Sequence, residues 1–139
     1  MIIAESGGAN YATYNYDESG ARIVADAAEE KGGAGGAFRP HDLLCAAYAS
    51  CLNITVRMVL DRMGLVYDKV TVQVDLERTE ENTTFLYHVE ITGEIEETLK
   101  ERAIAKAMRC PVRKTLEKPI RFQPMTESDG GKERPICQS

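Results

Sequence analysis

The longest apolar stretch of the chain runs from Pro40 to Gly64, and it carries no charged residue between Leu43 and Val56. Leucine, isoleucine, valine and tyrosine are mixed there with alanine and serine, so apolar positions occur nearly all round a helix. This pattern predicts a buried helix. Pro40 suits its first turn and Gly64 suits the position after its last turn. The uncharged run is shorter than the roughly 20 apolar residues that a membrane span needs.

After Gly64 the pattern changes from helical to alternating. Apolar residues occupy every second position over residues 70–76 and again over residues 85–91. Each run predicts a strand with one face on the core and one in water. The polar residues 78–83 between them predict the turn of a long antiparallel hairpin, which ends at Gly93.

Residues 96–108 return to a helical pattern, and their acidic start complements the helix dipole. Pro111 should break this helix and begin a short new one, with Cys110 as the N-cap residue. Ile120–Gln123, between two prolines, predicts a last edge strand. We expect the polar segment 127–139 to be a flexible tail.

The first thirty residues predict short strands. The segment YATYNY alternates aromatic with small or polar residues, and Asp17–Gly20 predicts a turn into a second strand near Arg22–Asp26. Four glycines within residues 32–36 mark a loop. They match neither a GK[ST] nor a GxGxxG phosphate-binding motif, so a plain flexible loop is the better interpretation. No internal repeat occurs, and residues 1–139 are predicted to form one domain.

Composition narrows the class of protein. The chain has 139 residues and a formal net charge of −5, which argues against nucleic acid or an anionic membrane as its main partner. The first ten residues lack the features of a signal peptide, so we expect a cytoplasmic protein. Its four cysteines, which have no disulfide-framework spacing, are expected to be reduced. They are Cys45, Cys51, Cys110 and Cys137.

Two of these cysteines are candidates for chemistry. A thiol reacts as its thiolate, so its surroundings must lower its pKa. Cys110 is predicted at a helix N-terminus, with Arg109, Arg113 and Lys114 nearby. Cys51 lies in the middle of an apolar helix, where burial opposes ionisation, and on the residues alone it can equally be a core side chain. The residues alone therefore favour Cys110 as the reactive thiol.

The segment PHDLLCAAYASC, followed about sixty positions later by RCPVRKTL, resembles the OsmC/Ohr family of osmotically inducible and organic hydroperoxide resistance proteins. The resemblance covers nearly the whole chain, and TVRMVLDRMGL is similar to the general OsmC-like branch. It implies an α+β fold in which antiparallel sheets pack around central buried helices. It also implies an intertwined homodimer with its active sites near the subunit interface.

The family resemblance also implies roles for the two cysteines. Cys51 would be the peroxidatic cysteine of an organic hydroperoxide reductase, and Cys110 the resolving cysteine that forms a disulfide with it. An external dithiol or a lipoylated protein would reduce that disulfide, and no cofactor or metal is implied. An apolar environment would favour organic peroxides, because each buried CH₂ contributes about 0.8 kcal/mol. These roles reverse the order that the residues alone favour.

The supporting residues of the family match less well. Family members use an arginine beside the thiolate and a carboxylate that holds it; their glutamate follows the proline, where this chain has His41. Asp42 comes one place later and can equally be a simple helix N-terminal acid. Arg22 and Arg39 are the candidate arginines, and each can equally be an ordinary surface residue.

Other interpretations stay open. A small-molecule binding or redox-sensing stress protein would use the cysteines differently and hold its ligand in an apolar crevice. General disulfide exchange with protein partners is a further alternative. His41 and Cys45 have i,i+4 spacing, but the sequence offers no further ligands at metal-site spacing, so no metal site is expected. Cys45 is expected in the core, His88 on a solvated strand, and Cys137 without a role.

Overall fold

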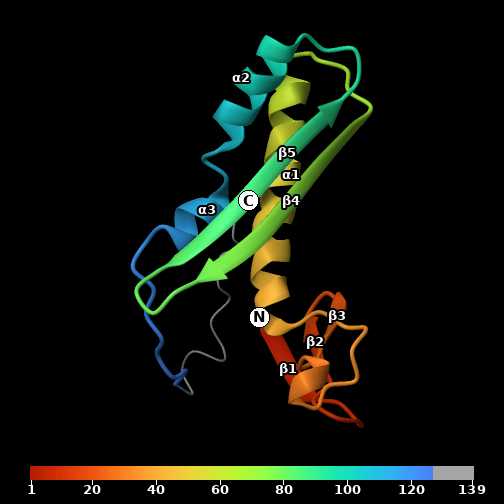
Figure 1. Cartoon of the computed structure of the whole chain (residues 1–139), viewed down its shortest axis with the longest axis vertical. Helices are drawn as coiled ribbons and strands as arrows, with labels where there is room; N and C mark the ends of the chain where they lie inside the picture. Colours follow the sequence, from red (N-terminus) through yellow and green to blue (C-terminus); the bar gives the residue numbers. More distant parts are fainter. Residues whose placement is uncertain (127–139) are drawn as a thin grey trace.

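One long helix carries two separate antiparallel sheets in a computed structural model that describes residues 1–126 (Figure 1). The predicted tail 127–139 and Cys137 lie outside the described residues. The α+β fold predicted from the sequence is confirmed. In chain order the elements are β1 (Ile2–Ser6), β2 (Thr13–Asp17), β3 (Arg22–Ala25), η1 (Glu29–Lys31), α1 (Pro40–Arg62), β4 (Lys69–Arg78), β5 (Thr83–Thr92), α2 (Glu97–Ala107) and α3 (Pro111–Leu116).

Helix α1 begins and ends where its local signals predict. Pro40 is the first helical residue, and Gly64 follows the C-cap with a φ of +67°, a conformation that glycine adopts without strain. The N–H of Leu65 donates to the C=O of Leu60 at 3.0 Å, and the N–H of Gly64 donates to the C=O of Asp61 at 3.0 Å. These two bonds form a Schellman motif, which satisfies the last carbonyls of the helix.

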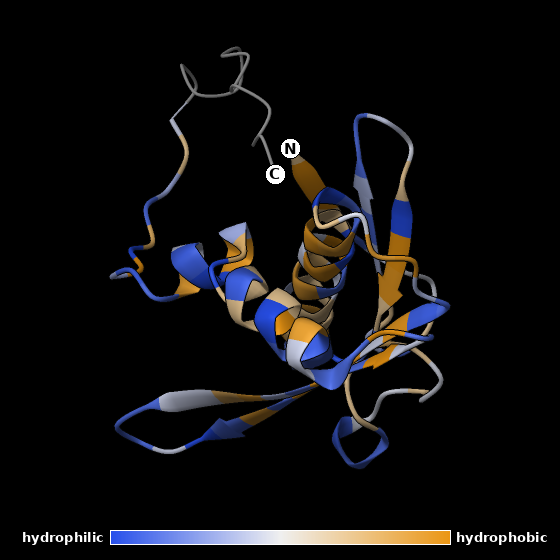
Figure 2. Cartoon of the chain, turned by 90° about the horizontal axis from the view of Figure 1, so that it is seen from above, coloured by the Kyte–Doolittle hydropathy of each residue, from blue (hydrophilic) through white to orange (hydrophobic). Residues whose placement is uncertain are grey.

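The prediction that α1 is buried holds for only one of its faces. Its fully buried side chains recur every fourth residue and are Tyr48, Leu52, Val56 and Leu60. Leu44, Ile54 and Met58 on the remaining surface are 45%, 43% and 44% exposed. The hairpin, α2 and α3 pack on α1 along its buried residues, and within residues 1–126 these apolar side chains on the rest of its surface stay largely exposed. In Figure 2 the ribbon of α1 is orange over much of its circumference.

By length and composition alone, α1 is also the one helix among residues 1–126 that could cross a membrane. The core helix of a soluble protein passes the same test, and 22% of this part of α1 is buried inside the single chain.

The long hairpin β4–β5 confirms the prediction made from the two alternating runs. Its register extends from Lys69 opposite Thr92 to Arg78 opposite Thr83. The strands cross α1 diagonally (Figure 1). Val70 of β4 belongs to the hydrophobic core cluster that also contains the buried residues of α1. Alternation is what allows this packing, because one face of each strand points to the helix and the other to water.

Helices α2 and α3 lie on another side of α1. Ala103 and Ala107 are fully buried between α2 and α1, and their small side chains allow a close approach of the two helices. As predicted, Pro111 opens α3 and Cys110 is its N-cap residue. This break turns the chain so that α3 also packs on α1.

The prediction of an edge strand at Ile120–Gln123 is wrong. These residues have no regular secondary structure, and Phe122 is 94% exposed. An edge strand needs a neighbouring strand for its backbone hydrogen bonds, and no described segment of this chain pairs with it.

The N-terminal sheet has the strand order β1-β2-β3 and lies at the N-terminal end of α1 (Figure 1). Its second turn confirms the turn predicted at Asp17–Gly20, because the Asp17 carboxylate accepts the N–H groups of Ser19 and Ala21, both at 2.9 Å. All five residues of β1 are exposed. The sheet thus contributes little to the core formed by α1, α2 and the hairpin.

Candidate redox site

The fold brings Cys51 of α1 and Cys110 of α3 together. The backbone N–H of Val112, in the first turn of α3, donates to Cys51 Sγ at 3.4 Å, and the thiol of Cys110 interacts with the thiol of Cys51. Cys51 is half-buried, whereas Cys110 is completely buried. Both thiols are free. The start of α3 thus provides a hydrogen-bond donor to the Cys51 sulfur.

The environment of Cys110 differs from what its motif suggests. Burial raises the pKa of the Cys110 thiol, and the adjacent Cys51 raises it further. The backbone N–H and the guanidinium of Arg113 act in the opposite direction. Because burial dominates, Cys110 is a protonated thiol at neutral pH in this fold. The order favoured by the residues alone considered the helix N-terminus and the nearby cations of Cys110, but not its burial, which opposes ionisation.

Arg113, one of the cations that the sequence places near Cys110, lies on α3 and was not predicted to be a site residue. Its Nε donates to Glu117 Oε1 at 2.7 Å, and its Nη1 donates to Met108 Sδ at 3.7 Å. It also interacts with the hydroxyl groups of Tyr48 and Tyr87. The sequence feature that pointed to Arg113 was its position three residues after Cys110, in the first turn of α3.

Residues 32–124 match the model of the OsmC-like protein family. The chain is an OsmC-like protein.

Solved structures agree with this assignment. The organic hydroperoxide resistance protein OsmC of Legionella pneumophila is 27% identical, with a TM-score of 0.62 over 84% of this chain and 89% of that one. An OsmC-like protein of Mycoplasma pneumoniae is 20% identical, with a TM-score of 0.69 over 84% and 86%. The organic hydroperoxide resistance protein OhrB of Bacillus subtilis is 20% identical, with a TM-score of 0.58 over 84% and 89%. No curated protein matches. These structures show that the chain shares the OsmC/Ohr fold.

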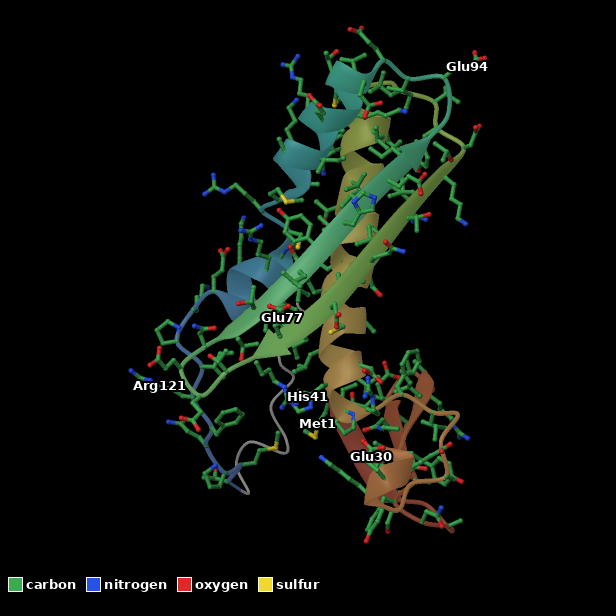
Figure 3. All side chains as sticks on the ribbon, viewed as in Figure 1. Met1, Glu30, His41, Glu77, Glu94 and Arg121 are labelled. Carbon is green, nitrogen blue, oxygen red and sulfur yellow. The ribbon has the colours of Figure 1, made fainter. Side chains whose placement is uncertain are left out.

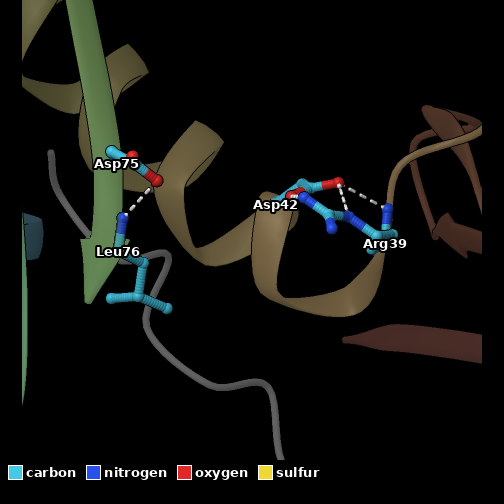
Figure 4. A network of polar contacts seen from close by, with 4 residues as sticks. All are labelled: Arg39, Asp42, Asp75 and Leu76. Carbon is cyan, nitrogen blue, oxygen red and sulfur yellow. Dashed lines mark hydrogen bonds and ion pairs between the residues drawn. The ribbon is translucent and has the colours of Figure 1, made fainter. Parts of the chain in front are cut away.

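In this OsmC-like protein, Arg39 and Asp42 pair with each other at the start of α1 (Figure 4). The Arg39 guanidinium donates to the Asp42 carboxylate at 3.0 and 2.9 Å, and the Arg39 backbone N–H donates to it at 2.9 Å. The Arg39 bonds hold the pKa of Asp42 below its usual value. Asp42 precedes Cys51 by nine residues, or about 13 Å of helix rise, so this pair does not reach the cysteine of its own chain.

Arg22 also lies away from the cysteine pair in the single chain. It lies exposed on β3, opposite Tyr16 in the sheet register, and β3 belongs to the N-terminal sheet at the first end of α1. The fold therefore brings together Cys51 and Cys110, but none of Asp42, Arg22 and Arg39 joins them within one chain.

Replacing Asp42 with alanine is expected to lower the free energy of unfolding by about 0.5–1 kcal/mol at pH 7, because the first turn of α1 loses its acid and an N–H acceptor. The folded pKa of Asp42 lies below its unfolded value, so this contribution is present above the unfolded pKa and disappears as the pH falls through the folded one. Urea unfolding of both proteins at pH 7 and in acid measures it. Asp61→Ala, at the opposite end of α1, should cause no such loss; an equal loss there would contradict the capping role.

His41 and Cys45 do not form a metal site with other residues. His41 lies at the start of α1 (Figure 3), where Arg78 Nη1 contacts its Nε2 at 3.0 Å. Burial raises the pKa of the Cys45 thiol. Within residues 1–126, no group of three or more His, Cys, Asp or Glu side chains is arranged to hold a metal ion.

A cavity of about 690 Å³ lies between the N-terminal sheet, the start of α1 and the end of β4. Charged residues occupy much of its wall, among them Asp42, Asp75 and Arg78. This cavity does not include Cys51 or Cys110.

Proposed function

We propose that this OsmC-like protein is a two-cysteine peroxidase for organic hydroperoxides. The Cys51 thiolate attacks the outer oxygen of ROOH, the O–O bond breaks, and RO⁻ leaves and takes up a proton to become ROH. Cys51 is then a sulfenic acid. The Cys110 thiolate attacks the Cys51 sulfur, the S–O bond breaks, and hydroxide leaves and becomes water. An external dithiol, free or protein-bound, supplies the two electrons that return the disulfide to two thiols.

The proximity of the two cysteines is the observation that carries this proposal: α3 packs on α1, and the N–H of Val112, two residues after Cys110, donates to Cys51 Sγ at 3.4 Å. A sulfenic acid beside a second thiol condenses to a reversible disulfide, which protects it from further oxidation. The exposures of the two groups match the two roles, because the half-buried Cys51 can be reached by a peroxide and the buried Cys110 cannot. The reaction needs only these sulfurs and the dithiol, so no cofactor is proposed.

An organic substrate fits the surroundings of Cys51. Cys51 packs against the hydrophobic core cluster, which includes Leu52 and Tyr48, and Val112 packs against the same cluster. Each CH₂ of a substrate tail that leaves water contributes about 0.8 kcal/mol, and hydrogen peroxide has no such tail.

We further propose that a second copy of the chain covers the open face of α1. Only 22% of the most apolar part of α1 is buried in the single chain. The N-terminal sheet likewise exposes Ile2 and Ile23, at 69% and 38%, and a small sheet without a packing partner is marginally stable. In a twofold dimer the same patch of each subunit faces the other, so these two exposed surfaces would be covered by their copies in the partner subunit. It would also offer the partner's Arg22 and Arg39 as candidates to stabilise the Cys51 thiolate. In the single chain, both arginines lie away from Cys51.

Titration with cumene hydroperoxide tests the function. One equivalent should remove two free thiols per chain and produce a disulfide that peptide mapping assigns to Cys51 and Cys110, while Cys45 stays reduced. Hydrogen peroxide at the same concentration should react more slowly. If an excess of organic hydroperoxide leaves both thiols free, the protein is not a peroxidase, and a binding or sensing role on the same fold takes its place.

A further inference from the structure

We propose that the basic outer surface of α2 and α3 is the docking site for the reductant, and that this reductant is an acidic protein that carries a dithiol. This inference rests on the peroxidase function proposed above, because it concerns the step that returns the Cys51–Cys110 disulfide to two thiols. The surface is named the basic face here. Its exposed cations are Arg102, Lys106, Arg109, Lys114, Lys118 and Arg121.

The basic face differs in charge from the rest of the protein. Residues 102–121 contain seven arginine or lysine residues and a single acidic residue, Glu117. The whole chain has a net charge of −5, and all but one of its 22 acidic residues lie outside this segment. Charge divided so unevenly attracts an acidic partner to one surface and repels it from the others.

Packing brings several of these cations around one hollow. Helices α2 and α3 lie on the same side of α1 (Figure 1), and the residues that follow each of them share a surface hollow of about 450 Å³. Four of the six residues in its wall are cations. The wall consists of Met108, Arg109, Arg113, Lys114, Glu117 and Lys118.

Most of the positive charge in this hollow is not neutralised by the described part of the chain. Glu117 accepts a hydrogen bond from Arg113 Nε at 2.7 Å, and this ion pair cancels one of the four cations. Arg109, Lys114 and Lys118 form no ion pair with an acidic group of residues 1–126. Cations gathered in this way repel one another, and a partner rich in carboxylates relieves that repulsion.

A protein fits the basic face better than a small dithiol does. The cations continue beyond the hollow along α2, where Arg102 and Lys106 are one turn apart and exposed. They continue past α3 to Arg121, which is also exposed. A small anion would occupy the hollow and leave these charges without a partner, whereas an acidic protein surface can meet all of them.

The basic face borders the cysteine pair. Arg109 directly precedes Cys110, and the N–H of Val112 donates to Cys51 Sγ at 3.4 Å. Met108, in the wall of the hollow, packs against the same hydrophobic core cluster as Cys51. A protein bound to this face therefore lies beside the disulfide that it must reduce.

Exposure decides which sulfur the donor attacks. Cys110 is completely buried, whereas Cys51 is half-buried and open to an incoming thiolate. The donor thiolate attacks Cys51 Sγ, the Cys51–Cys110 bond breaks, and Cys110 leaves as a thiolate that takes up a proton. The second donor thiol, as its thiolate, then attacks the donor sulfur of the mixed disulfide. Cys51 leaves and takes up a proton, and the donor becomes a disulfide.

The experiment measures how fast two matched peptide dithiols reduce this disulfide. Both peptides have a Cys-Gly-Pro-Cys core; one has glutamates on both sides of it, and its twin has glutamines at the same positions. The protein is oxidised with one equivalent of cumene hydroperoxide or, in parallel, with the thiol oxidant diamide. Each rate is divided by the rate of the same peptide with hydroxyethyl disulfide, which removes differences in thiol reactivity. Dithiothreitol serves as the uncharged dithiol.

The wild type should react faster with the glutamate peptide than with its twin at low salt. This difference should disappear at about 1 M salt, where charges are screened beyond about 3 Å. Lys114→Gln/Lys118→Gln should lower the low-salt rate with the glutamate peptide about three- to tenfold, because each exposed charge contributes modestly to the encounter. Its rates with the glutamine peptide and with dithiothreitol should match the wild type, which shows that the fold is intact.

The matched control is Lys31→Gln/Lys69→Gln, which removes the same two charges from exposed positions on η1 and β4. It should keep the wild-type rate with both peptides. Equal normalised rates for the two peptides in the wild type, or an equal loss in this control, would rule out docking on the basic face. Binding of the wild type to phosphatidylglycerol vesicles that Lys114→Gln/Lys118→Gln abolishes would assign the face to a membrane instead.

Failure of the peroxidase function gives a different result. A protein that forms the Cys51–Cys110 disulfide with diamide but not with cumene hydroperoxide is not a peroxidase. The peptide rates on the diamide-oxidised protein then still decide whether the basic face selects an acidic dithiol.

Discussion

Replacing Cys51 with serine is expected to abolish the consumption of organic hydroperoxide, with a loss of at least about a thousandfold in rate. A serine hydroxyl is not ionised at neutral pH and does not form a sulfenic acid, so neither the first step nor the disulfide can follow. The measurement is the disappearance of cumene hydroperoxide with dithiothreitol as the reductant. No other described thiol can take over, because burial raises the pKa of both Cys45 and Cys110.

Two matched variants show whether this loss belongs to Cys51. Cys45→Ser removes a thiol from the same helix, six residues earlier, and should keep full activity. Cys110→Ser should complete the first step once and then stop with a sulfenic acid at Cys51, which dimedone traps. Peroxide consumption that survives in Cys51→Ser, or that is lost equally in Cys45→Ser, would assign the chemistry to another group.

Replacing Ile54 with glutamate should convert the protein from a dimer to a monomer. Ile54 is 43% exposed on the open face of α1, and a twofold interface would bury it twice. Each copy would lose about 1.5–3 kcal/mol of apolar burial and place an unpaired carboxylate in the interface, which costs more. Since 1.4 kcal/mol is tenfold in affinity, the dissociation constant should rise about a thousandfold or more. Sedimentation equilibrium of both proteins measures this change.

The control for this variant is Val66→Glu. Val66 is 86% exposed in the loop between α1 and β4, so a charge there should leave the dimer intact. A wild-type protein that sediments as a monomer would contradict the proposed dimer. So would flotation of the wild type with lipid vesicles, since the apolar face of α1 would then have a membrane as its partner.

Local signals were sufficient for most of the fold. The helix from Pro40 follows from an uncharged run with a proline at its start and a glycine after its end, and the hairpin follows from two alternating runs with a polar turn. The N-cap position of Cys110 follows from the proline after it. Each of these features depends on interactions within a few residues, which is why the sequence alone predicts them. The predicted strand at Ile120–Gln123 failed because a strand depends on a distant partner.

The sequence by itself determined the order of the elements and, through its resemblance to a family, the two cysteines worth examining. Only the tertiary structure decided that Cys110 is buried while Cys51 is half-buried, and that α3 packs on α1 so that the two cysteines lie close together. It also showed that one face of α1 is left open. Burial and contacts between residues far apart in the chain arise when α1, α3 and the hairpin pack together, and a pattern read along the chain contains no distance between them.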